Sequence, residues 1–139
     1  MINGVFDVTP AQYHAIRADF AKTPDVFIGE ADGRLICDNA SFYRVIGTAM
    51  GAPADAMGQI TNQHWFYDEM TTLYWFEDAQ GNQRYQQYVL AVTHPDEIRQ
   101  DTRWGYREMF ENLAQFWGDG VVRYVVDGQA RGFAVYLVR

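Results

Sequence analysis

The feature that most constrains the fold is an uninterrupted apolar run at residues 88–92. A strand with one face in water alternates apolar and polar residues, whereas a strand covered on both faces is apolar throughout. Segments with the periodicity of amphipathic helices lie before and after this run. Since strands that alternate with helices form layered sheets, the sequence predicts an α/β fold with a small, mostly parallel sheet packed by helices.

Helices are predicted where apolar residues recur at intervals of three and four. Thr9 and Pro10 are typical of a helix start, as cap and first-turn residue. A second helix begins near Asn39, a third runs from Thr61 or Asn62 to about Trp75, and a last one ends at Gly118. The predicted core positions on these helices are Phe42, Ile46, Phe66, Met70, Met109, Phe110 and Leu113.

The predicted sheet has three strands, near residues 26–31, 88–92 and 121–126. A short strand at residues 2–8 is also possible from its apolar character. Asp127 and Gly128 are turn residues, so residues 121–126 and 133–138 are expected to pair as a C-terminal hairpin. We expect one domain over residues 1–139. Residues 1–25 are expected to extend its core at the N-terminus with an extra helix, and residues 127–139 are expected to add a C-terminal strand to it.

Charge favours a protein partner. The chain of 139 residues has a formal net charge of −7 and a pI near 4.7, whereas nucleic-acid binding needs clustered Lys and Arg. No Lys or Arg occurs from residue 45 to residue 83. The acidic residues of that stretch are Asp55, Asp68, Glu69, Glu77 and Asp78. Complementary charge selects partners, so this stretch indicates a basic protein as the binding partner.

Motifs for catalysis are absent from the sequence. The histidines at positions 14, 64 and 94 are far apart, and Cys37 has no second cysteine to pair with. No phosphate-binding loop or nucleophile elbow occurs. We therefore expect neither an enzyme nor a bound cofactor or metal. No segment reaches the roughly 20 apolar residues of a membrane span, and we expect a cytoplasmic protein that is a monomer or part of a 1:1 complex.

The third predicted helix has two different faces. Phe66, Met70 and Leu73 stack on one side, and a rotation of about 100° per residue places a polar set on the other. That set consists of His64, Asp68, Thr71 and Trp75. It predicts a binding surface centred on Asp68, with Tyr67 beside it and Asp55 and Glu69 at its edge. The alternative is an ordinary solvated face with Trp75 folded back onto the core.

Residues 32–71 resemble the barstar family, the intracellular inhibitors of ribonucleases. Asp32-Gly33, Ser41-Phe42-Tyr43, Gly51-Ala52-Pro53 and Gly58 follow the family's order. Residues 62–71 are similar to its N-x-D-A-x-W-D-x-L-T pattern: Asn62, Asp68 and Thr71 match, Tyr67 stands for tryptophan and Met70 for leucine. By pattern of strands and helices the resemblance extends over about residues 26–126.

The resemblance implies a three-stranded parallel sheet and an immunity or inhibitor protein that occludes the active site of a ribonuclease toxin with an acidic helix and loop. Asp68 would hold the central role, because His64 stands where the family has its first helical aspartate. Asp101 is nearest to a further acid that the family carries before its last helix. The alternatives are immunity to another toxin, such as a DNase, an adaptor module without a toxin, and a small-molecule enzyme.

Overall fold

The computed structural model describes residues 1–58, 60, 62–99, 105–119 and 129–139. Its 4-stranded sheet is parallel throughout and has the order β1-β4-β3-β2. The strands are β1 (Gly4–Val8), β2 (Val26–Asp32), β3 (Gln87–Thr93) and β4 (Gly132–Val138). The predicted α/β class with a parallel sheet is confirmed, and the sheet has one strand more than expected.

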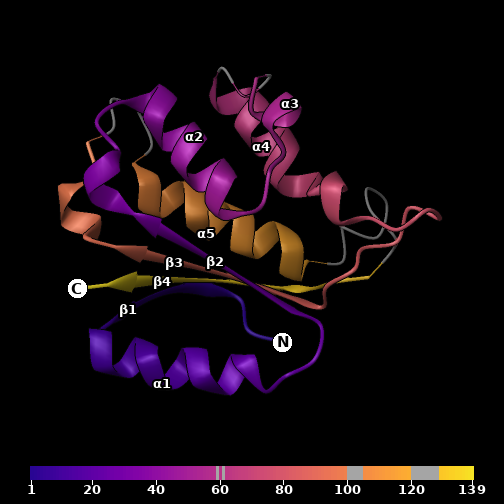
Figure 1. Cartoon of the computed structure of the whole chain (residues 1–139), viewed down its shortest axis with the longest axis horizontal. Coiled ribbons are helices and arrows are strands. Elements are labelled where there is room, and N and C mark those ends of the chain that lie inside the picture. Colours follow the sequence, from indigo (N-terminus) through magenta and orange to yellow (C-terminus); the bar gives the residue numbers. More distant parts are fainter. Residues whose placement is uncertain (59, 61, 100–104, 120–128) are drawn as a thin grey trace.

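Helices cover both faces of the sheet (Figure 1). One face carries α1 (Pro10–Ala21), and the other carries α2 (Asn39–Ala49), α4 (Gln63–Thr72) and α5 (Tyr106–Gly118). The short α3 (Ala54–Met57) connects α2 to α4 on the same side as those helices. Three short 3-10 turns complete the described elements: η1 (Gly33–Leu35), η2 (Tyr74–Phe76) and η3 (Pro95–Glu97).

The central strands β3 and β4 explain why the sheet needs both layers. Tyr88, Leu90 and Val92 of β3 belong to the core under α2, α4 and α5, whereas Val89 and Ala91 face α1. All five are at most 1% exposed. The apolar run at residues 88–92 is therefore a strand buried on both faces, as predicted.

Local sequence signals set the helix starts. The Thr9 hydroxyl oxygen accepts from the Gln12 backbone N–H, and the Gln12 side-chain oxygen accepts from the Thr9 backbone N–H. This pair forms a capping box at the start of α1. Asn62 caps α4 by accepting from the Trp65 backbone N–H at 3.0 Å. At α2 the cap is Asp38 rather than Asn39, because the Asp38 carboxylate accepts from the Ser41 backbone N–H at 2.7 Å.

The C-terminal hairpin prediction is wrong. β4 pairs in parallel with β1 on one side and β3 on the other, so neither edge of β4 is available for an antiparallel partner. The predicted strand at residues 121–126 lies outside the described residues, and the third strand beside β2 and β3 is β4. The physical reason is that residues 133–138 are apolar throughout, as expected of a central strand covered on both faces.

The N-terminal segment is part of the sheet rather than an addition to it. β1 pairs with β4 from Gly4 to Val8, and α1 supplies the layer that buries the second face. The helical core positions predicted from periodicity are also confirmed. Each of Phe42, Ile46, Phe66, Met70, Met109, Phe110 and Leu113 is at most 1% exposed.

We predict that Phe110→Ala lowers the free energy of unfolding by about 3–5 kcal/mol, because the Phe110 ring is fully buried and packs against Phe42 and Tyr106. Urea unfolding followed by circular dichroism measures the change. Leu35→Ala is the matched control: Leu35 is 63% exposed, and its truncation should change stability by at most about 0.5 kcal/mol. Equal effects of the two changes would contradict the packing described for α5.

Candidate functional site

The predicted binding helix exists as α4, and its outer face presents an acid. Phe66 and Met70 are fully buried, whereas the side chains of His64 and Asp68 are 82% and 55% exposed. The His64 Nε2 lies 3.4 Å from the Asp68 Oδ2, one helical turn away. The remaining predicted residues of this face lie differently.

Trp75 is separated from this face because α4 ends early. Leu73 takes a left-handed conformation (φ 42°), which ends the helix at Thr72, and Trp75 follows on η2. Its indole N–H donates to the Met50 carbonyl at 3.0 Å, so the ring is half-buried at the end of α2. The expectation that the helix continues to Trp75 is wrong, since a left-handed backbone at leucine is not signalled by helical periodicity.

Tyr67 and Thr71 have their polar groups engaged within the fold. The Thr71 hydroxyl donates to the Tyr67 carbonyl at 2.7 Å, and the half-buried Tyr67 hydroxyl accepts from the Asn112 amide of α5 at 3.4 Å. Burial raises the pKa of Tyr67. Asp101, the expected further acid, lies outside the described residues.

Glu69 and Asp55, expected at the edge of the surface, differ in exposure. Asp55 is exposed in the first turn of α3, whereas Glu69 is only 7% exposed. Burial first, and then the charges of Glu69 and Asp55, raise the pKa of Tyr74. The pKa of Glu69 is itself raised, first by burial and then by the Asp68 charge.

Two aromatic residues at this place were missed by the sequence analysis. Trp65 is 44% exposed and Tyr74 is 42% exposed, which is unusual for large aromatic side chains. Trp65 lies about 100° around the helix from Phe66, on the same flank as Glu69. This offset from the apolar stripe was the signal in the sequence that Trp65 is exposed. We call the group Asp55, His64, Trp65, Asp68, Glu69 and Tyr74 the α4 surface.

The carboxyl end of α4 is held by side-chain donors from elsewhere in the chain. The Gln83 amide donates to the carbonyls of Thr72 at 2.6 Å and Leu73 at 3.2 Å, and the Trp117 indole donates to the Met70 carbonyl at 2.9 Å. The Tyr88 hydroxyl of β3 contacts the Gln83 side-chain oxygen. Because these groups are buried, they fix where α4 ends and thereby where its outer face points.

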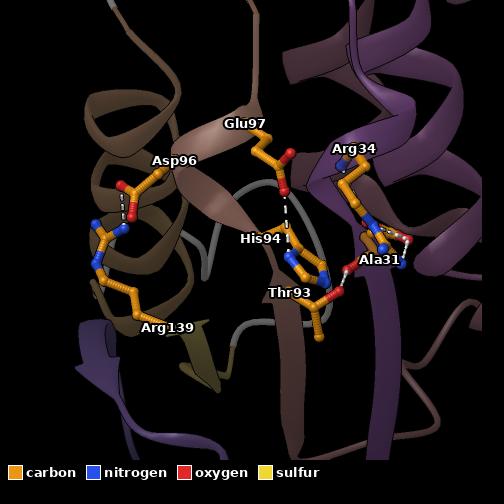
Figure 2. Close-up of polar contacts among 8 residues, drawn as sticks. Ala31, Arg34, Thr93, His94, Asp96, Glu97 and Arg139 are labelled. Carbon is orange, nitrogen blue, oxygen red and sulfur yellow. Dashed lines mark hydrogen bonds and ion pairs between the residues drawn. The ribbon is translucent and has the colours of Figure 1, made fainter.

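A second polar site lies where the parallel strands end. A cleft of about 710 Å³ separates the first turns of α1 from the segment after β3, with Tyr13, Arg17, Glu30 and His94 among its lining residues. Ligands of α/β proteins bind at the carboxyl ends of strands, so this cleft is a natural candidate. Figure 2 shows its rim, where the His94 Nδ1 lies 3.2 Å from Glu97 and Arg139 meets Asp96.

The charges at this edge are already paired within the chain. The pairs are Arg17–Glu30, Arg34–Asp32, Arg107–Asp7, Arg139–Asp7, Arg139–Asp96 and His94–Glu97. Hydrogen bonds from Arg34 lower the pKa of Asp32 to about 2, and those from Arg107 lower the pKa of Asp7. Arg107, Asp7, Arg139 and Asp96 form one continuous chain of contacts, which joins the ends of β1 and β4 to α5 and η3, and the other three pairs are separate from it.

The α4 surface differs in charge balance. Within the described part of the chain, no Lys or Arg forms an ion pair with Asp55, Asp68 or Glu69. The described residues also contain no group of three His, Cys, Asp or Glu side chains placed to hold a metal ion. Carboxylates that have no Lys or Arg partner, beside exposed aromatic rings, are suited to a cationic protein surface.

Comparison with known proteins finds no matching family model, no matching curated protein and no matching solved structure. Among the helices of the described residues, none combines the length and the apolar character that crossing a membrane requires. The α4 surface is therefore the basis on which a function can be proposed.

We predict that Gln83→Ala lowers the free energy of unfolding by about 1–3 kcal/mol, because it leaves two carbonyls at the end of α4 and the buried Tyr88 hydroxyl without this partner. Urea unfolding measures the loss. Gln80→Ala, at an exposed position of the following turn, is the control and should change stability by at most about 0.5 kcal/mol. A Gln83 variant as stable as the Gln80 variant would contradict the role given to this amide.

Proposed function

We propose that the protein is an inhibitor or immunity protein that binds a basic nuclease toxin through the α4 surface and covers the toxin's active site. The observation that carries the proposal is the charge of this surface. Asp55 and Asp68 are exposed beside Trp65 and Tyr74, in a stretch of the chain without Lys or Arg. A nuclease active site that binds phosphates is cationic, so acidic side chains can occupy the positions of the phosphates.

Each component of the surface has a physical part in such binding. The net charge of −7 and the carboxylates of the α4 surface attract a basic protein over distance and speed the encounter. Once the surfaces meet, exposed aromatic rings supply the apolar anchors that make up most of the affinity at protein interfaces. Asp68, in the middle of the outer face of α4, would be the charged anchor.

The order of elements supports a barstar-like core as the finer description of the fold. Strands β2, β3 and β4 are neighbours and parallel. Along the chain, α2 and α4 come between β2 and β3, and α5 comes between β3 and β4. All three helices lie on one face of the sheet. That is the arrangement which the resemblance of residues 32–71 to the barstar family implies. In this proposal β1 and α1 are additions that extend the sheet and cover its second face.

The presence of His64 favours a partner toxin other than the ribonuclease that the barstar family inhibits. Where the family has an aspartate, His64 brings an imidazole 3.4 Å from Asp68 and changes the charge that the partner meets. A ribonuclease remains the first expectation, and a DNase with a cationic active site would fit the same surface. We place the protein in the cytoplasm as part of the proposal, since immunity proteins act where the toxin acts.

We predict that Asp68→Ala and Trp65→Ala each weaken toxin binding by about 2–5 kcal/mol, or about 30-fold and more, because each change removes an anchor that becomes desolvated in the complex. Both side chains are exposed in the free protein, so stability should change by at most about 0.5 kcal/mol. The immobilised protein captures the toxin from a lysate of its own cells, mass spectrometry identifies it, and nuclease assays and calorimetry follow.

Asp19→Asn, at an exposed position of α1 on the opposite side of the sheet, is the control and should bind as the wild type does. Stoichiometric inhibition of the captured nuclease supports the proposal. Capture of a protein without nuclease activity points to the adaptor alternative, and equal affinity of wild type and folded Asp68→Ala protein would show that the α4 surface is not the site.

A further inference from the structure

One oxygen of the buried Glu69 carboxyl group has no hydrogen-bond donor among the described residues. Its side chain is 7% exposed, and its Oε2 atom is covered and makes no hydrogen bond to the described chain. Burying a carboxylate without a partner is unfavourable, and proteins usually avoid it by pairing the charge. At the carboxyl edge of the sheet this chain does so repeatedly, whereas at Glu69 it does not.

Within the described part of the chain, the groups that interact electrostatically with Glu69 include no cation that could pair with its carboxylate. The Asp68 charge on α4 acts on the Glu69 carboxyl group, and the charges of Glu69 and of Asp55 on α3 both act on Tyr74 of η2. None of them is a cation, and the stretch from residue 45 to residue 83 contains no Lys or Arg. The imidazole of His64 lies on another flank of α4, against Asp68. Both burial and Asp68 raise the pKa of Glu69.

Glu69 also lies at the point where a partner would dock. Trp65 precedes it by one turn on the same flank of α4 and is 44% exposed. Exposed aromatic side chains change rotamer within nanoseconds, so a partner that packs on Trp65 can reach this flank of α4 without moving the helix.

We infer that Glu69 receives a Lys or Arg side chain of the partner on the flank of α4 that also carries Trp65, and that binding is coupled to release of the proton from the Glu69 carboxyl group. This inference rests on the proposed function and adds to it the group on the partner and a linkage to pH. Relative to a carboxyl group in water, burial and the Asp68 charge shift Glu69 toward the protonated form. A cation against it favours the carboxylate, and the released proton passes to the solvent.

The direction of the pH effects follows from the raised pKa. In the free protein, the contribution of Glu69 to stability is present at pH values below its ordinary pKa and is lost as the pH rises through the raised pKa. In the complex a cation lowers that pKa, so affinity increases with pH over the same interval. Glu69→Gln removes both effects, because an amide does not titrate.

The test uses Glu69→Gln, Asp68→Asn and, as a control, Glu108→Gln at an exposed position of α5. The probe is a tetra-arginine peptide. We expect Glu69→Gln to bind it at least tenfold more weakly than wild type at pH 7, yet to unfold at a higher urea concentration. Calorimetry in buffers of different ionisation heat should show proton release on binding by wild type at pH values above the ordinary pKa of a glutamate, and less for Glu69→Gln. The Glu108→Gln protein should match wild type.

The outcomes separate this inference from the proposed function. Weaker peptide binding by Asp68→Asn together with unchanged binding and proton release by Glu69→Gln would overturn the inference and leave the α4 surface as the site. A Glu69→Gln protein that is less stable than wild type at pH 7 would also overturn it, since Glu69 would then stabilise the free fold. No peptide binding by wild type would overturn the inference, while nuclease capture decides the proposed function independently.

Discussion

Burial of β3 and β4 on both faces is the constraint on which the rest of the structure depends. Two adjacent parallel strands whose side chains are almost all inaccessible to water need an apolar layer above and below. The chain supplies α1 on one side and α2, α4 and α5 on the other, and the parallel direction requires a crossover before each strand. The packing of α4 against this core leaves His64 and Asp68 on its outer side.

The two polar regions of the molecule differ in how their charges are balanced. At the carboxyl edge of the sheet, arginines and one histidine pair with the carboxylates, and these contacts join strand ends that are distant in sequence. On the α4 surface, within the described residues, no Lys or Arg pairs with the carboxylates: Asp68 meets only the His64 imidazole, and the Oε2 atom of Glu69 is buried without a donor. An arrangement that lowers the stability of the free fold is expected where a partner supplies the missing interaction.

Much of the fold follows from patterns that single segments carry. The helices, their buried stripes, the caps at Thr9 and Asn62 and the strand pair β2–β3 were all predictable, because periodicity and capping are local. The place of β4 was not predicted, since strand order depends on long-range pairing. Trp75 was misplaced for a related reason: the left-handed Leu73 and the contact of η2 with the end of α2 arise from tertiary packing.

Hydrogen–deuterium exchange of the free protein and of its complex with the captured nuclease tests the central claim most directly. The account predicts that binding slows exchange in α3, α4 and η2 and leaves η3 and the first turns of α1 unchanged. Slower exchange at η3 and α1, with α4 unchanged, would contradict it, because the partner would then occupy the cleft at the carboxyl ends of the strands.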